Sequence, residues 1–355
     1  MNTKNLMKKI MGMTLVTTLL ITSMVSALGS TPMKKTLDRD GMPPGTVYVD
    51  DDFNENTSGW GVDHFATIQN GINAVANNGT VHVEDGFYQE NIVVNKSILL
   101  LGHDKNLVML YAKTHYHVVT ITADNVCIGG FTIAYSGGYR AGILIDHSDY
   151  VTVMNNIIRN NAWGIAVEFS QNCLIQSNMI SNNVEIGVLL EYSPLNTIYD
   201  NTVMLNGLSG IHLVQDSNNN RIYRNNLIDN EYYNAYDSGM NTWDGGNLSY
   251  GNYWSDYTGS DNNSDGIGDT PYIIPGLNLT NMDRFPLMHR FILGDMNCDG
   301  TVNFADINPF VLAMTNPEAY RAQFHILPAL HGDINQDGSF DFGDINPFTA
   351  LISGQ

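Results

Sequence analysis

The sequence is poor in three features that define common protein classes: cysteine, basic residues and long apolar runs. Its 355 residues include three cysteines, odd in number and far apart, so no disulfide framework is implied. Sixteen Lys and Arg stand against 36 Asp and Glu, so the formal net charge is −20. This charge argues against nucleic acid or an anionic membrane surface as a partner. The apolar run Ile10–Met24 is short for a membrane span, and no later segment is longer.

Residues 1–27 have the pattern of a secretory signal peptide. Three lysines precede the apolar run, and Val25–Ala27 supplies small residues at a cleavage site. We therefore expect residues 28–45 to be a linker. The mature protein is expected to be secreted, extracellular and cell-surface associated, without a membrane span. An uncleaved membrane anchor is the alternative interpretation.

A repeat of 22 to 23 residues occupies the middle of the chain, and its copies begin at Gly142, Gly164, Gly187 and Gly210. Each copy holds short alternating apolar stretches separated by Asn, Gly and Ser turns, which is typical of β-strands. Stacked copies bury a continuous aliphatic core that no single copy could bury alone. The pattern predicts an all-β fold, a right-handed parallel β-helix over residues 46–290.

Asparagines recur in two columns of this repeat. Their amides can hydrogen-bond between stacked copies and satisfy the backbone of the bends, and asparagine tolerates a left-handed backbone. The columns are Asn156, Asn178, Asn201 and Asn225, and Asn161, Asn183, Asn206 and Asn230. Upstream, Phe65, Ile68, Ile72 and Val75 have helical spacing, which predicts a helix over the open N-terminal end of the coil.

Two nearly identical stretches near the C-terminus have the spacing of a calcium loop. Oxygen-bearing side chains occupy positions 1, 3, 5, 7, 9 and 12, and position 6 is Gly300 or Gly338, where the loop turns sharply. Ca²⁺ takes six to eight oxygen ligands, so we expect it as cofactor. The predicted ligands are Asp295, Asn297, Asp299, Thr301, Asn303 and Asp306 in one loop, and Asp333, Asn335, Asp337, Ser339, Asp341 and Asp344 in the other.

A third segment carries a related pattern. Asp261, Asn263, Asp265 and Asp269 have spacing that could hold another Ca²⁺. A polar turn with local hydrogen bonds is the alternative.

The stretches VYVDDDF (47–53), HFATIQNGINAVANNGTVHVEDGFYQENI (64–92) and KSILLLG resemble the opening of NosD-like, pectin-lyase-type β-helix proteins. Residues 251–276 and DRFPLM (283–288) resemble their closing segment. Residues 291–355 resemble a type I dockerin, which implies a small α-helical calcium-loop domain that binds a cohesin-like protein. Loop positions 10 and 11 depart from that family, because Phe304–Ala305 and Phe342–Gly343 replace a small hydroxyl pair.

An acidic column stands on the outward face of the predicted strands. Asp146, Glu168 and Glu191 each lie four residues after a repeat glycine, so stacking places them one above another. We expect the β-helix to bind extracellular polysaccharide, with the C-terminal domain as a tether. A polysaccharide hydrolase or lyase using these carboxylates is one alternative, and a structural spacer without ligand is another. The lack of Arg or Lys on this face counts against a lyase.

Overall fold

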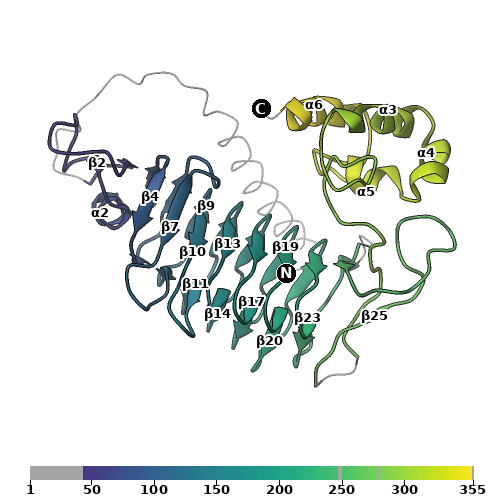
Figure 1. The fold of residues 1–355 in the computed structure, drawn as a ribbon, viewed down its shortest axis with the longest axis horizontal. Helices are drawn as coiled ribbons and strands as arrows, with labels where there is room; N and C mark the ends of the chain where they lie inside the picture. The colour runs from purple at the N-terminus through teal and green to yellow at the C-terminus, as the bar shows by residue number, and fades with distance from the viewer. Residues whose placement is uncertain (1–42, 247–249, 278–279, 354–355) are drawn as a thin grey trace, which may run out of the picture.

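The computed structural model describes residues 43–246, 250–277 and 280–353 of the 355. The predicted signal peptide (1–27) and nearly all of the predicted linker (28–45) lie outside these ranges. The chain winds into an elongated coil of parallel strands, and a cluster of short helices follows it at the C-terminal end of the described residues (Figure 1).

Three parallel sheets, here called A, B and C, form the faces of the coil, and each turn of chain contributes one strand to each sheet in that order. Sheet A contains β2 (His64–Phe65), β1 (Thr46–Val49), β3 (Thr80–Val83), β6 (Leu99–Gly102), β9 (Cys127–Gly129), β12 (Thr152–Met154), β15 (Leu174–Gln176), β18 (Thr197–Tyr199) and β21 (Arg221–Tyr223). Sheet B contains β4 (Gly86–Gln89), β7 (Val108–Tyr111), β10 (Thr132–Ala134), β13 (Ile157–Arg159), β16 (Met179–Ser181), β19 (Thr202–Met204), β22 (Asn226–Ile228) and β24 (Tyr253–Trp254).

Sheet C contains β5 (Ile92–Val94), β8 (Val119–Ile121), β11 (Ala141–Asp146), β14 (Trp163–Glu168), β17 (Ile186–Glu191), β20 (Ser209–Val214) and β23 (Tyr233–Asp237). The predicted right-handed parallel β-helix is therefore confirmed. A short antiparallel pair, β25 (Tyr272–Ile273) and β26 (Met282–Asp283), follows it.

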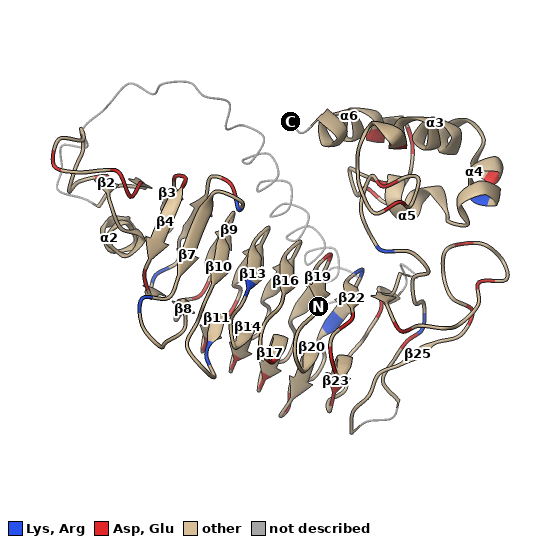
Figure 2. Ribbon diagram, in the orientation of Figure 1, with Lys and Arg blue, Asp and Glu red and all other residues tan. Residues whose placement is uncertain are grey.

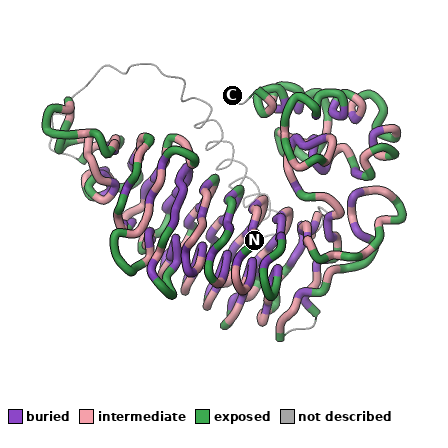
Figure 3. Tube along the Cα trace, in the orientation of Figure 1, coloured by how far each residue is buried: buried purple, intermediate pink, exposed green. Residues whose placement is uncertain are grey.

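The core is a set of aliphatic columns inside the coil. Buried positions recur along the successive turns of the chain trace (Figure 3). In sheet C, Ile143 pairs with Ile165, which pairs with Val188, and that residue pairs with Ile211. All four are fully buried. Because like residues repeat in register, each turn buries its apolar side chains against the next one, as the repeat predicts.

The two predicted asparagine columns are hydrogen-bonded ladders. In ladder 1 (Asn156, Asn178, Asn201, Asn225 and Asn252), each Oδ1 accepts the backbone N–H and the side-chain amide of the asparagine one turn earlier. Ladder 2 repeats this arrangement at the next bend, with Asn161, Asn183, Asn206 and Asn230. It ends on Asn234, only four residues after Asn230, and the Oδ1 of Asn234 accepts the N–H and side-chain amide of Asn230.

The left-handed backbone at these bends lies one residue before each ladder asparagine. Asn155 and Asn160 have φ of 54° and 57°, and Asp200 and Arg224 have φ of 57° and 54°. The expectation that the ladder asparagines themselves take this conformation was therefore wrong. Their buried amides are held instead by hydrogen bonds to neighbouring turns.

Two further ladders occupy the bend between sheets C and A. Ser148, Ser170 and Ser193 donate their backbone N–H to the hydroxyl of the serine one turn later, and the column ends at Ser217. Ladder 3 contains Asn196, Asn220 and Asn241, and it starts from the backbone N–H of Cys173.

The N-terminal end of the coil is covered as predicted, by a helix that is shorter than the apolar spacing indicates. Helix α2 spans Ile68–Ala74 and is capped by Thr67, whose hydroxyl accepts the N–H of Asn70. Ile68 and Ile72 are fully buried against the first strands. The Glu90 carboxylate accepts the N–H groups of Ile68 and Gln69, which satisfies donors at the start of this helix.

The C-terminal module consists of two similar halves that pack on each other. Its elements are η2 (Phe304–Asp306), α3 (Ile307–Thr315), α4 (Pro317–Phe324), α5 (Pro328–Gly332), η3 (Phe342–Asp344) and α6 (Ile345–Ser353). Phe310 and Phe348 are buried, and their rings stack 4.1 Å apart. Residues from the two halves thus share one small core, separate from that of the coil.

The module is fixed to the end of the β-helix by polar contacts. Asn226 of β22 exchanges two hydrogen bonds with the backbone of Phe291, at 2.9 and 2.7 Å. Arg321 of α4 donates to the carbonyl groups of Asn263 and Ser264, and the N–H of Leu327 donates to the carbonyl of Asp265. The closing segment of the coil therefore lies against the module.

Removal of one ladder amide from the middle of the coil is expected to destabilise the protein. Asn201→Ala would leave the N–H and side-chain amide of Asn178 without their acceptor, and the carbonyls of Ile175 and Tyr199 without a donor. We expect a loss of about 3 kcal/mol in the free energy of unfolding, measured by denaturant titration. Asn106→Ala, at an exposed turn, is the control and should cost no more than about 0.5 kcal/mol. Equal losses in the two variants would contradict the ladder account.

Candidate functional site

The predicted acidic column is assembled at the end of three neighbouring strands of sheet C. Asp146 pairs in register with Glu168, and Glu168 pairs with Glu191. Acidic positions mark the ends of β14 and β17 in Figure 2. The column stops at Val214, the partner of Glu191 on β20. All three acidic residues are partly exposed, so their carboxylates are accessible to solvent.

Stacked rings, which the sequence analysis missed, lie directly beside the acidic column. His147, Phe169 and Tyr192 each follow one of the acidic residues and have φ of 49°. Their ring centroids are 4.7 and 4.9 Å apart, and their planes are nearly parallel. Because each ring covers the face of the next, the stack presents mainly ring edges to solvent, and Phe169 is 48 % exposed. The signal was present in the sequence, since an aromatic or imidazole side chain follows each acid.

An open groove of about 490 Å³ runs along this stack. Its lining residues are Asp124, His147, Asp149, Phe169, Ser170, Gln171, Tyr192 and Pro194. Asp149 is held by the next turn, because its carboxylate accepts the backbone N–H and the side-chain amide of Gln171. The bend between sheets C and A thus combines carboxylates, an amide and ring edges along the coil axis. We call this surface, with the acidic column, the corner surface.

Glu168 is the electrostatic centre of the corner surface. Partial burial raises the pKa of its carboxyl, and the neighbouring charges of Glu191 and Asp146 raise it further, while His147 and Arg140 act in the opposite direction. Asp146 is held by the ring of His147, whose Nδ1 lies 2.5 Å from a carboxylate oxygen. A carboxyl with a raised pKa beside a second carboxyl has the chemistry of an acid–base pair.

Two other residues bear on the predicted chemistry. His212 lies in the middle of β20, stacks on Tyr236 at 4.7 Å and does not join the acids. Arg140 acts on the pKa of Glu168, although it lies just before β11, whose far end carries Asp146. The repeat alone indicated that this face lacks Arg and Lys. Arg140 nevertheless places basic charge in the neighbourhood of the column.

The two aspartate loops of the C-terminal module have the same backbone. The first aspartate of each loop, Asp295 or Asp333, accepts the N–H groups of positions 5 and 6 at 2.9–3.1 Å. The glycine at position 6 has φ of 91° in one loop and 93° in the other. The last aspartate, Asp306 or Asp344, accepts the N–H groups of positions 3 and 9.

The third predicted segment turns in the same way. Asp261 accepts the N–H groups of Asp265 and Gly266 at 3.2 and 2.9 Å, and Gly266 has φ of 86°. Asp269 accepts the N–H of Asn262. The first six positions therefore share one conformation in all three segments. Local hydrogen bonds hold each segment, which is also what the alternative interpretation of the third segment, a polar turn, predicts.

Negative charge is crowded within the two loops of the module. Burial raises the pKa of Asp295, and the charges of Asp306 and Asp299 raise it further. Burial likewise raises the pKa of Asp333, beside Asp344 and Asp337. A bound cation would relieve this repulsion.

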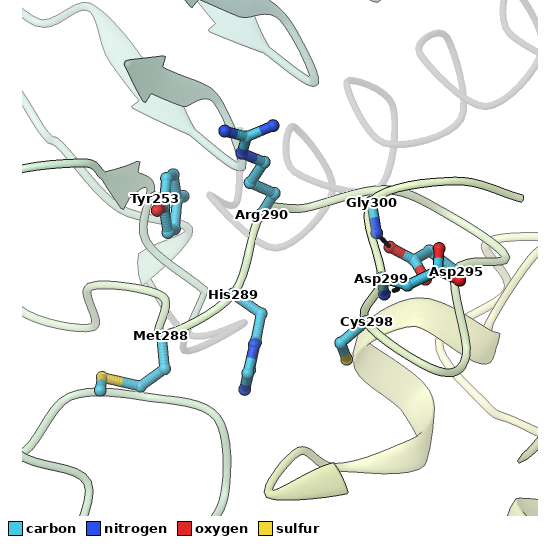
Figure 4. Close-up of a pocket in the computed structure, with 8 residues that line it drawn as sticks. All are labelled: Tyr253, Met288, His289, Arg290, Asp295, Cys298, Asp299 and Gly300. Carbon is cyan, nitrogen blue, oxygen red and sulfur yellow. Dashed lines mark hydrogen bonds between the residues drawn. The ribbon is translucent and has the colours of Figure 1, made fainter. Parts of the chain in front are cut away.

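A cavity of about 210 Å³ lies between the end of the β-helix and the first loop (Figure 4). Met288, His289 and Cys298 contribute to its lining. The sulfur atoms of Met288 and Cys298 lie on either side of the His289 ring in this view. Burial raises the pKa of the Cys298 thiol to about 12, so this cysteine is a neutral thiol. All three cysteines of the chain are free, and Cys127 and Cys173 are buried.

Residues 45–259 match the family described as "Periplasmic copper-binding protein (NosD)". This range is more than half of the chain. The protein belongs to the NosD family. The chain is 35 % identical over 134 residues to "Probable ABC transporter binding protein NosD" of Stutzerimonas stutzeri, which covers 37 % of this chain and 28 % of the relative. It is 32 % identical over 160 residues to "Cell surface glycoprotein" of Methanothermus fervidus, covering 42 % of this chain and 26 % of that protein. The chain thus spans less than a third of the length of these relatives.

Solved β-helix structures resemble this NosD-family chain only distantly. Pectin methylesterase PemA from Erwinia chrysanthemi has 12 % sequence identity and a TM-score of 0.36, over 56 % of this chain and 81 % of the enzyme. Similarity at this level carries no argument about activity.

The described residues contain no donor set that fits the copper named in the family description. Across the described ranges, no group of three or more His, Cys, Asp and Glu side chains is arranged to hold a metal ion. That finding includes the loop carboxylates, which accept backbone N–H groups instead. Met288, His289 and Cys298 lie outside the matched range 45–259. Among the same described residues, none of the helices has the length and apolar character needed to cross a membrane.

Proposed function

We propose that this NosD-family protein is an extracytoplasmic β-helix that binds a polysaccharide along the corner surface and is held in place by its C-terminal module. The observation that carries the proposal is the in-register pairing of Asp146, Glu168 and Glu191 beside the groove and the stacked rings. The names of the relatives, a periplasmic binding protein and a cell surface glycoprotein, support a location outside the cytoplasm.

The geometry of the corner surface suits a chain that lies along the coil axis. Each turn offers one carboxylate and one ring edge, and turns repeat at the ~4.8 Å spacing of paired strands. Carboxylates accept charge-assisted hydrogen bonds from hydroxyl groups, which neutral sugars supply in abundance. A ligand with repeating hydroxyl groups can therefore make the same contact on successive turns.

The negative charge of the corner surface favours neutral polysaccharides over acidic ones. The groove and the column contain five carboxylates: Asp124, Asp146, Asp149, Glu168 and Glu191. A polyuronate would bring its own carboxylates beside them, and like charges in close contact disfavour binding. We therefore propose a neutral glycan as the ligand class, in preference to an acidic one.

Binding to a panel of neutral and uronate polysaccharides tests this function. We expect the wild type to bind at least one neutral polymer, and Glu168→Gln or Phe169→Ala to weaken that binding by about tenfold, or about 1.4 kcal/mol each. The matched controls are Glu231→Gln and Phe87→Ala, which change exposed residues away from the groove. Affinity electrophoresis or calorimetry measures the effect. Absence of glycan binding in the wild type would favour the spacer interpretation, whereas preference for polyuronates would contradict the charge argument.

The raised pKa of Glu168 favours cleavage of a glycan as the second candidate function. A carboxyl whose pKa is raised by burial and neighbouring charge is suited to act as a general acid, and Asp146 or Glu191 can act as its partner. Release of reducing sugar by the wild type, abolished in Glu168→Gln, would establish a hydrolase. Binding without release supports the binding function alone.

We further propose that Ca²⁺ binds the two loops of the C-terminal module, and a third Ca²⁺ binds Asp261–Asp269. Support comes from the oxygen-only donor sets, the common backbone of the three segments and the crowded charge around Asp295 and Asp333. Bound Ca²⁺ would fix the loop backbone and so present Phe304 and Phe342, which are 72 % and 81 % exposed, to a cohesin-like partner. Calcium-dependent capture of the protein on an immobilised cohesin domain tests that last step.

Calcium binding can be measured directly. Adding Ca²⁺ to chelator-treated protein should raise the unfolding temperature of the module, since a ligand that binds only the folded state stabilises by mass action. Asp295→Asn and Asp333→Asn should each weaken binding at one loop by about tenfold or more in calorimetry, because each removes a charged ligand. The control is Asp216→Asn in an exposed bend. No heat and no thermal shift at millimolar Ca²⁺ would contradict the proposal.

A further inference from the structure

Each of the three asparagine ladders ends on an aspartate. In ladder 1, Asp283 accepts the backbone N–H of Asn252 at 2.6 Å and its side-chain amide at 3.4 Å. In ladder 2, Asp256 accepts the amide of Asn234 at 2.7 Å. In ladder 3, Asp237 accepts the amide of Asn241 at 2.8 Å.

The direction of the ladders explains this choice. The backbone N–H of each asparagine in ladder 1 donates to the asparagine one turn later, toward the C-terminal end, although the side-chain amides also donate to carbonyls one turn earlier. Each chain of backbone N–H bonds must therefore finish on an acceptor. A carboxyl brings no donor when ionised and one when protonated, whereas an asparagine at this place would bring two N–H groups that need acceptors of their own. Aspartate therefore satisfies the last turn without requiring another turn beyond it.

An aromatic side chain donates to each of these aspartates. The donors are the indole N–H of Trp243 to Asp237 at 2.7 Å, the indole N–H of Trp254 to Asp283 at 2.9 Å, and the hydroxyl of Tyr272 to Asp256 at 2.9 Å.

The same three rings close the apolar core. Trp254 stacks on Tyr272 at 4.0 Å and lies 5.8 Å from Trp243. Both tryptophans are fully buried at the end of the aliphatic columns. One group of six side chains thus terminates the polar ladders and the core together.

We propose that these three aspartate–aromatic pairs form a pH-sensitive latch that fastens the closing segment (251–276 and 283–288) to the last turn of the β-helix. The latch goes beyond glycan and calcium binding, because its residues take part in neither.

Asp283 gives the latch its pH response. Its carboxylate is fully buried and accepts N–H groups of Asn252, Trp254 and Phe285. Burial nevertheless raises its pKa to about 7, which means that these bonds do not offset the loss of water. Burial also raises the pKa of Asp237, while Asp256 is exposed.

Nearby charged groups are already engaged with other partners. The neighbouring guanidinium of Arg284 is bound by both oxygens of Asp244 at 2.7 and 2.8 Å. Tyr272, which pairs with Asp283 across β25 and β26, directs its hydroxyl to Asp256. The buried charge on Asp283 is therefore supported by hydrogen bonds alone.

The sign of the effect follows from proton linkage. The ordinary pKa of the group is 3.8, so between about pH 4 and pH 7 the folded chain holds a proton that the unfolded chain has released. Stability contributed by this group is therefore fully present below about pH 4 and is lost as pH rises to about 7. The latch holds most tightly below about pH 4 and loosens as pH rises to about 7.

Thermal unfolding of the full chain at pH 5 to 8, followed by tryptophan fluorescence, tests the latch. We expect the Tm of the wild type to fall by several degrees relative to Asp283→Asn as pH rises from 5 to 8, because the variant lacks the titrating group. Asp229→Asn, an exposed carboxyl in the preceding bend, is the control and should follow the wild type. Parallel pH profiles of wild type and Asp283→Asn would overturn the pH response.

A second variant keeps the test decisive if Asp283→Asn does not fold. Trp254→Phe preserves an aromatic ring at the end of the core but removes the donor to Asp283. We expect a lower Tm than the wild type at every pH and faster hydrogen exchange of the Asn252 and Phe285 amides than of ladder amides in mid-coil. An unchanged Tm with unchanged exchange at these two amides would overturn the latch itself. Both outcomes are independent of glycan and calcium binding.

Discussion

The structure depends on hydrogen bonds from the backbone N–H groups of the bends, which run in one direction along the coil axis. Each bend turns its backbone polar groups inward, where no water can satisfy them, and the amide of an asparagine one turn later supplies the missing acceptor. This requirement recurs on every turn, so it fixes the register of the stack. A one-residue slip would face the buried amides with aliphatic side chains and bring the aliphatic columns outward.

Register then determines what the outer surface can do. Because Asp146, Glu168 and Glu191 are held in register by the same turns, their carboxylates crowd together and the pKa of Glu168 rises. The adjacent rings stack for the same reason. A repeating ligand can contact such a surface on successive turns, whereas the copper named in the family description finds no matching donors in the described residues. The ends of the coil are handled separately, by α2 at one end and by the aromatic rings and their aspartates at the other.

Much of the coil could be predicted because its repeat places equivalent residues at fixed intervals. Asn156, Asn178 and Asn201 are recognisable as one column, and the acidic column follows from the same alignment. The serine ladder could not be distinguished, since serine is common in any turn. Asp237 and Asp283 lie where the repeat breaks down, so spacing gave no indication that they terminate ladders. The left-handed residue at each bend was misplaced by one position, because both neighbours are often asparagine. Docking of the module against Asn263 and Ser264 depends on contacts between distant segments, which periodicity does not encode.

Amide hydrogen exchange of the native protein tests the central claim most directly. The account predicts that the backbone N–H groups of Asn156, Asn178 and Asn201 exchange only with global unfolding of the coil, because each is buried and bonded to the next ladder amide. The N–H groups of exposed loop residues such as Asn56 and Asn106 should exchange far faster. Ladder amides that exchange at the rate of these exposed positions would contradict the claim that one-way asparagine ladders hold the turns in register.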